Sequence, residues 1–220
     1  MKTSEEITYD RLKALIIENK LPKGEFLSQR KLAESVGATI VTLRSSLRLL
    51  ENDGLLENVP KWGVRIPIED EDSIRERYYV RELLEVGAWE LILDRNQASD
   101  RELLLEAAEA CDGVRFTGSE SYREFARVHG DFHMLIAKLC GNEMLAKMLT
   151  RLSFRSVMLY NAKYGWEQHQ EYLTERHHYN FVRTVFDSER EIALQAVREH
   201  VIRGRDMELA ALEQVERGER

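Results

Sequence analysis

Four of the six histidines occupy positions from which they could bind a metal ion. His129 and His133 are four residues apart, which places both on one face of a helix. His178 and His200 lie on the apolar stripes of two later predicted helices. A neutral imidazole nitrogen is a common metal ligand, and two at this spacing can hold one ion. The pattern allows a metal centre inside a helical bundle, but each histidine could equally be a hydrogen-bonded core residue.

Arg81 is the second residue whose position suggests chemistry. Its helical stripe also contains the apolar residues Ile74 and Ala88, together with Tyr78, so its guanidinium is expected to point into the interior. A buried arginine needs a partner. One candidate is Glu85 at i+4, and the other is the carboxylate of a bound effector, held bidentately. Tyr78 and Arg155 are further candidates for effector binding.

The region from Ser73 onward is predicted to form an antiparallel bundle of about six helices. Strand-like alternation is absent, and glycines such as Gly113 and Gly141 fall where helices are expected to end. The predicted helices span residues 73–94, 99–112, 120–140, 142–163, 167–186 and 188–214.

The first part of the chain is predicted to be a winged helix-turn-helix. A helix over about 4–19 is followed by a second, with Ser28 as its N-cap and Gly37 at its end, and by a third capped by Thr39. Two strands, 55–59 and 64–66, flank a tip that contains Lys61, and Phe26 belongs to a short extended link. The expected fold class is therefore mainly α.

The third helix separates into an apolar and a polar face. Leu43, Leu47 and Leu50 recur at helical spacing and should pack inward, whereas Arg44 and Arg48 project from the opposite side. A helix without acidic residues before its last turn can enter a major groove without repelling phosphates. The alternative, a solvated face that binds nothing, is the weaker interpretation in this arrangement of helices.

Charge and proline content divide the chain near Pro67. The first 68 residues contain 11 Lys and Arg against 9 Asp and Glu, whereas the remainder contains 21 against 30. All three prolines lie in the first part. We expect a DNA-binding domain over 1–68 and a helical effector-binding and dimerisation domain over 69–220. Two cysteines, no membrane span and no signal peptide favour a cytoplasmic protein.

The predicted DNA-binding domain, residues 1–68, resembles the GntR family of transcription regulators. The resemblance lies in Leu21-Pro22-Lys23-Gly24-Glu25-Phe26-Leu27, in Arg30-Lys31-Leu32-Ala33-Glu34 through Gly37, and in Arg44 to Gly54-Leu55. Members usually have arginine at the position of Ile40, and without that guanidinium the operator should differ from the common family site. The proline usual at the position of Thr42 is also missing, which should have little effect. Together, pattern and resemblance give as DNA-contacting candidates Arg30, Thr39, Ile40, Val41, Thr42, Arg44, Arg48, Lys61 and Gly63.

The predicted helical domain, residues 69–220, resembles the effector domain of the FadR branch of this family. The matching residues are Arg81-Glu82-Leu83-Leu84-Glu85, Phe132-His133 with Gly141-Asn142, and His178 with His200. Many such domains bind a divalent metal through one Asp and three His, and the metal helps to bind a carboxylate. The resemblance implies His133, His178 and His200 as ligands, with His129 at the Asp position, a change that favours zinc or nickel over manganese.

These observations predict a homodimeric transcription regulator and not an enzyme. It would bind a palindromic double-stranded DNA operator, act as a repressor, and respond to a small organic acid, with or without a divalent metal. Two alternatives stay open at this point: a metal-dependent enzyme that carries a DNA-targeting head, and a constitutive repressor with a structural metal in its bundle.

Overall fold

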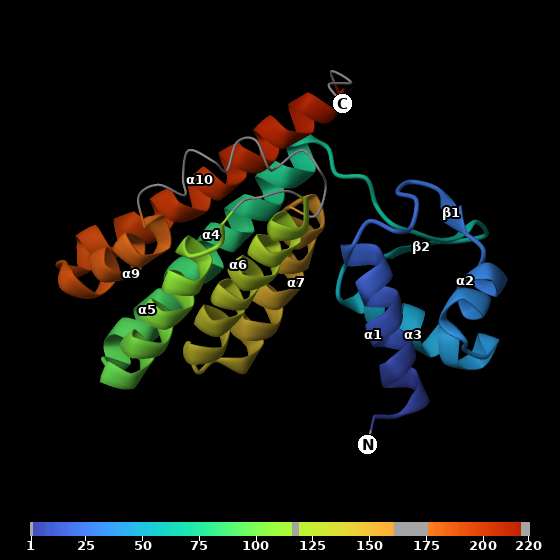
Figure 1. Ribbon diagram of the computed structural model, residues 1–220, viewed down its shortest axis with the longest axis horizontal. Coiled ribbons are helices and arrows are strands. Elements are labelled where there is room, and N and C mark those ends of the chain that lie inside the picture. Colours follow the sequence, from blue (N-terminus) through green and yellow to red (C-terminus); the bar gives the residue numbers. More distant parts are fainter. Residues whose placement is uncertain (1, 116–118, 161–175, 217–220) are drawn as a thin grey trace. The chain divides into compact units, whose positions relative to one another are not determined.

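The computed structural model describes residues 2–115, 119–160 and 176–216, and the chain forms two compact units. Unit 1 comprises Met1–Glu69 and unit 2 comprises Asp70–Arg220. Over the described residues, unit 1 contains three helices and a small sheet, and unit 2 contains helices alone (Figure 1). The predicted fold class, a winged helix-turn-helix followed by a helical bundle, is confirmed.

Unit 1 begins with three helices: α1 (Ser4–Ile17), α2 (Gln29–Val36) and α3 (Ile40–Asn52). Ser28 and Thr39 cap α2 and α3 by accepting bonds from backbone N–H groups, as expected from their types. Gly37 ends α2 with a φ of +65°, a conformation that costs glycine little. The turn between α2 and α3 is thus only three residues long, 37–39. The core between the helices contains Leu12, Ile16, Leu32, Val36, Leu43, Leu47 and Leu50.

The wing is part of a three-stranded antiparallel sheet, in place of the two-stranded ribbon expected from the sequence. Its strands are β1 (Phe26–Leu27), β2 (Glu57–Val59) and β3 (Gly63–Arg65), in the order β1-β3-β2. The segment interpreted as a short link is β1, which pairs with β3. A strand of two residues is too short to show alternation of apolar and polar residues, so the sequence contains no pattern that predicts this pairing. β2 starts two residues later than predicted because Leu55 and Leu56 are buried in the core.

Unit 2 contains six helices within its described residues, as predicted. They are α4 (Glu71–Arg95), α5 (Ala98–Asp112), α6 (Ser119–Leu139), α7 (Glu143–Tyr160), α9 (His177–Asp187) and α10 (Arg190–Glu216). α4 packs against α6, α7 and α10, and α9 packs against α5 and α10. α4 begins two residues earlier than predicted because Asp70 and Ser73 form a capping box. The predicted helix over 167–186 is described from residue 177 onward.

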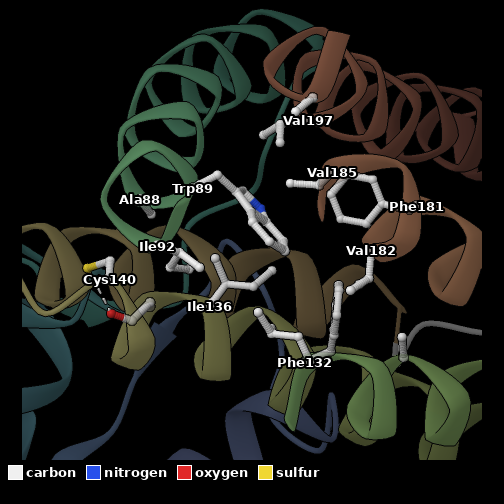
Figure 2. Packing of buried hydrophobic residues seen from close by; sticks show 14 of the residues in the cluster. Ala88, Trp89, Ile92, Phe132, Ile136, Cys140, Phe181, Val182, Val185 and Val197 are labelled. Carbon is white, nitrogen blue, oxygen red and sulfur yellow. Dashed lines mark hydrogen bonds between the residues drawn. The ribbon is translucent and has the colours of Figure 1, made fainter. Parts of the chain in front are cut away.

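Trp89 of α4 lies at the centre of the unit 2 core (Figure 2). It is fully buried and makes edge-on ring contacts with Phe181 and Phe186 of α9, at centroid distances of 5.5 and 5.9 Å. Ile136 of α6 and Val197 of α10 belong to the same cluster. This core fixes α6, α9 and α10, the helices that carry the histidines, relative to α4.

Candidate metal centre and DNA-binding surface

Three of the four predicted metal ligands come together in unit 2. His129 and His133 of α6 and His200 of α10 each offer a ring nitrogen, and these atoms all lie within 4.8 Å of one another. Four-coordinate zinc, with Zn–N bonds of 2.0–2.1 Å, holds its ligand nitrogens about 3.3 Å apart. Small side-chain rotations would close the remaining gap. The arrangement can therefore bind a divalent ion through three imidazoles.

Aromatic neighbours hold these imidazole rings in place. Phe125 stacks on His129 with ring centroids 5.3 Å apart, and Phe181 stacks on His200 at 4.2 Å. The Nδ1 atom of His200 is buried and has no hydrogen-bond partner among the described residues. A buried imidazole nitrogen without a partner is costly unless a ligand satisfies it. This orphaned nitrogen fits a metal better than it fits a core histidine held by a hydrogen bond.

His178, the fourth predicted ligand, lies beside the cluster in α9. Its ring centroid is 5.1 Å from that of His129 and 5.6 Å from that of His200. Its Nδ1 lies 2.8 Å from Oδ1 of Asp112 in α5. A carboxylate at Nδ1 selects the tautomer protonated there, which leaves Nε2 as the nitrogen that can bind an ion. His178 thus remains a candidate ligand through Nε2.

Asp112 also accepts hydrogen bonds from the backbone N–H groups of His178 and Tyr179, at the start of α9. Burial opposes its negative charge, but the bonds from His178 and Tyr179 outweigh that effect and hold the pKa of Asp112 below its usual range. Sequence reasoning missed this residue. Its partners are 66 and 67 positions away, and no local pattern marks it.

Glu85 links the arginine of α4 to the histidine cluster. Arg81 Nε donates to Glu85 Oε1 at 2.7 Å. Glu85, one of the two partners considered for Arg81 from the sequence, is therefore in contact with it. The same oxygen lies 3.3 Å from Nδ1 of His133. Although burial opposes the charge of Glu85, His133 and Arg81 keep its pKa well below the ordinary value. The contact between Glu85 and His133, on different helices, was not anticipated.

Burial lowers the pKa of each of the three clustered histidines. Burial lowers the pKa of His133, and Glu85 offsets this only in part. Burial and the neighbouring imidazoles hold the pKa of His129 and of His200 well below 6.5. Because a metal binds the unprotonated imidazole, these lowered pKa values favour the form of the cluster that can bind an ion.

Tyr78, predicted to bind an effector, belongs to a buried polar group between α4 and α10. Its hydroxyl donates to Oε1 of Glu208 at 2.7 Å and accepts from Arg81 Nη1 at 3.4 Å. The other oxygen of Glu208 accepts from Arg77. All four side chains are buried. These contacts join the first turns of α4 to the last turns of α10.

The histidine cluster opens into a pocket of about 540 Å³, mouth included. Tyr78, Arg81, Asp112, Arg203 and Met207 contribute to its wall beside the histidines. The side chain of Arg155, a further candidate for effector binding, lies outside the described residues.

His177 lies off the apolar stripe of its helix, a position that predicts a surface residue, but in the structure it is only partly exposed. It is half-buried and lines the pocket, with its ring stacked on that of His200 at 5.7 Å. Arg203 Nη1 lies 2.9 Å from its Nδ1. Burial, together with the neighbouring His178 and the Arg203 guanidinium, lowers the pKa of His177 to about 4. Its position off the apolar stripe, the basis of the prediction, does not exclude a place in a pocket wall.

The predicted DNA-contacting residues lie at the surface of unit 1. Thr39 and Thr42 form the cap of α3, with their hydroxyl oxygens 2.9 Å apart. Arg44 Nε donates to Oε1 of Gln29 at 3.1 Å, and Arg30 forms an exposed ion pair with Glu34. The side chains of most candidates are exposed or half-exposed: Arg30, Thr39, Ile40, Val41, Thr42, Arg44 and Arg48.

At the wing tip, Lys61 and Gly63 both have positive φ, of 71° and 105°, which makes a tight reversal between β2 and β3. Lys61 is exposed. Between them, Trp62 is 70% exposed and stacks on Phe26 at 5.6 Å. A cation and a large aromatic ring therefore project from the tip.

Comparison with known proteins agrees with this geometry. Residues 4–66 match the family model for bacterial regulatory proteins of the gntR family, and residues 76–203 match the model for the FCD domain. An uncharacterised HTH-type transcriptional regulator of Bacillus subtilis (strain 168), YdhC, is 26% identical over 194 residues, which cover 88% of this chain and 84% of that protein.

Two solved structures share the fold. The structure titled E. coli McbR/YncC has a TM-score of 0.72 at 19% identity, and the match covers 97% of this chain and 99% of that one. The crystal structure of a GntR transcriptional regulator from Rhodococcus sp. RHA1 has a TM-score of 0.73 at 18% identity, and the match covers 94% of this chain and 98% of that one. Within the described residues, no helix is both long and apolar enough to cross a bilayer.

The two family models together span nearly the whole chain, and each falls within one of the two structural units. The relatives are regulators of transcription, which excludes the alternative of a metal-dependent enzyme. The chain therefore belongs to the gntR family of bacterial regulatory proteins, as a DNA-binding transcription regulator whose second unit is an FCD effector-binding domain.

Proposed function

We propose that the chain is a cytoplasmic repressor that binds a palindromic operator as a homodimer and changes its operator affinity when a small organic acid binds in unit 2. The observation that carries this proposal is the convergence of three imidazoles, from α6 and α10, on one pocket. A pocket with convergent polar groups and shifted pKa values is where a ligand is expected.

The ligand set proposed for the metal is His129, His133 and His200, with Nε2 of His178 as a fourth donor. All four donors are imidazoles, which favours zinc or nickel. When bound, the ion supplies positive charge and open coordination positions for a carboxylate oxygen. The chain's own contribution is orientation, because Glu85 and Asp112 lie against Nδ1 of His133 and of His178.

Arg81 is proposed to bind the effector's carboxylate, with Tyr78 and Arg155 as further contacts. Arg81 lines the pocket, and its bond to Glu85 fixes the guanidinium before any ligand arrives. Fixed donors bind a carboxylate with a smaller loss of side-chain entropy than mobile ones.

Dimerisation is proposed because one winged helix contacts only a short half-site, and two are needed for the affinity of a palindrome. One side of α4 supports it: Tyr79, Val80 and Leu83 are 67%, 44% and 59% exposed. Exposed apolar side chains on neighbouring turns of one helix are typical of a protein interface. Effector binding would then change the relative placement of the two DNA-binding units.

The test combines metal analysis with DNA binding. We expect about one zinc or nickel ion per chain in protein purified without chelator, and its loss in His133→Ala. Chelating carboxylates should then shift operator affinity, measured by fluorescence anisotropy. A bound metal with no response to any acid would indicate a constitutive repressor. Absence of metal after incubation with zinc and dialysis would contradict the ligand assignment and leave an acid site centred on Arg81.

A further inference from the structure

The first turn of α3 presents apolar side chains where a recognition helix meets the bases. In a helix-turn-helix the N-terminal residues of the second helix of the motif, here α3, contact base edges in the major groove. Val41 is 77% exposed, and its neighbour Ile40 is 37% exposed. Exposed β-branched residues are poor helix formers, so these two do not stabilise α3 through their helix propensity.

The polar groups of this turn are engaged within the protein. The hydroxyls of Thr39 and Thr42 lie 2.9 Å apart, and Oγ1 of Thr39 also accepts the backbone N–H of Thr42. Ile40 and Val41 have no side-chain donor or acceptor. The most exposed surface that this end of α3 offers to a base pair is therefore a pair of methyl-bearing side chains.

Only one base carries an apolar group in the major groove. The C5 methyl of thymine projects there, whereas guanine, cytosine and adenine present hydrogen-bonding atoms. Contact between two methyl-bearing side chains and a guanine or cytosine edge would remove water from polar atoms without replacing its hydrogen bonds. Contact with a thymine methyl buries apolar surface on both sides.

We propose that Val41, supported by Ile40, recognises a thymine C5 methyl in each operator half-site and is a main determinant of operator specificity. The inference rests on the docking of α3 in the major groove. Removal of one methyl from such a contact corresponds to about 0.8 kcal/mol, or about a fourfold loss of affinity. Arg44 and Arg48, further along α3, then contribute phosphate contacts and affinity.

The experiment starts from operators selected by the full-length protein out of a random duplex pool. Each thymine of the selected half-site is replaced by uracil, which removes only the C5 methyl. We expect wild-type affinity to fall about fourfold at one or two positions. Val41→Ala should bind the thymine and uracil forms equally at one of these positions. Leu49→Ala, a similar truncation of a 41% exposed residue in the last turns of α3, should keep the wild-type preference.

Salt dependence separates this contact from phosphate binding. Val41→Ala should leave the slope of log affinity against log salt unchanged, because no counterion is released by a methyl contact. The inference would be overturned if the wild type bound every uracil-substituted operator as tightly as the thymine operator. It would also be overturned if Val41→Ala still preferred thymine to uracil at every position. Failure to select any duplex would instead overturn the docking of α3 on which it rests.

Discussion

Arg81 and Glu85, one turn apart on α4, form an ion pair that is almost completely removed from solvent, with side chains 4% and 2% exposed. Such pairs contribute little net stability, but loss of one partner leaves an unpaired charge in the interior. Because Glu85 also lies 3.3 Å from His133, the pair connects the stability of unit 2 with the geometry of the proposed metal site.

Glu85→Gln should therefore lower the free energy of unfolding by about 3–5 kcal/mol, since Arg81 would lose its counter-charge. Zinc affinity should also fall, by about 10–100-fold, because the support of His133 is weakened. Urea unfolding and zinc titration measure the two effects. Glu71→Gln is the matched control, since Arg75 and Glu71 form an i,i+4 pair on the same helix that is largely exposed. Its effect should stay within about 1 kcal/mol.

Asp112 should give unit 2 a pH-dependent stability. The pKa of Asp112 is lowered in the folded chain, so its stabilisation is complete above the unfolded-state value of about 3.9 and is lost as pH falls toward the folded value. The wild type should thus be more stable than Asp112→Asn at pH 7. This difference should shrink as the pH falls below about 4. A gap in unfolding free energy that is constant between pH 7 and 3 would contradict the assignment.

Tyr78→Phe tests whether this hydroxyl is structural. The group already donates to Glu208 and accepts from Arg81, so its removal should cost about 0.5–1.5 kcal/mol. We expect bound metal to stay at the wild-type level, because Tyr78 is not a proposed ligand. Thermal unfolding and metal analysis of the variant check both expectations. Unchanged stability with a lost effector response would show instead that the hydroxyl serves the effector directly.

Lys61 at the wing tip should contact phosphate. If it does, Lys61→Ala lowers the magnitude of the slope of log affinity against log salt by about 1. Anisotropy titrations at several salt concentrations measure the slope. Lys147→Ala, which removes an exposed lysine from α7 in unit 2, serves as control and should leave the slope unchanged. If Lys61→Ala and the wild type gave equal slopes, Lys61 would not contact phosphate in the complex with DNA.

Leu83→Glu should dissociate the proposed homodimer. It places a charge in the exposed apolar side of α4, which would be desolvated in a dimer. Light scattering after size-exclusion chromatography should give the monomer mass, and operator affinity should fall by at least tenfold. Leu103→Glu alters a similarly exposed leucine of α5 and should remain dimeric. A dimeric Leu83→Glu protein would place the interface elsewhere.

Features of the fold encoded by neighbouring residues could be predicted from the sequence. The caps Ser28 and Thr39 and the stop at Gly37 depend on contacts within a few residues, and all three are in the structure. His129 and His133 lie on one helix, so their shared face followed from spacing alone. The convergence of His200 on them needed the additional premise that apolar stripes of different helices meet in one core.

Apart from shifts of two residues at the starts of α4 and β2, the misses involve contacts between distant positions. β1 pairs with β3 across about 40 residues, and Asp112 meets His178 across 66. His177 was assigned to the surface because it leaves the apolar stripe, yet the mouth of a pocket is lined by such flanking positions. Periodicity distinguishes buried from exposed faces, but it does not identify the polar residue that will stand opposite.

The pairing of β1 with β3 has a consequence for regulation. β1 lies between α1 and α2 in the chain, so its bonds to β3 tie the wing to the helices that precede α3. We expect the wing tip and the recognition helix to move together for this reason, so that the contacts of one DNA-binding unit with its half-site stay the same. In a dimer, an effector would then act by changing the distance between the two DNA-binding units. Operators whose spacer differs by one base pair should then differ in effector response while keeping the same half-site preference.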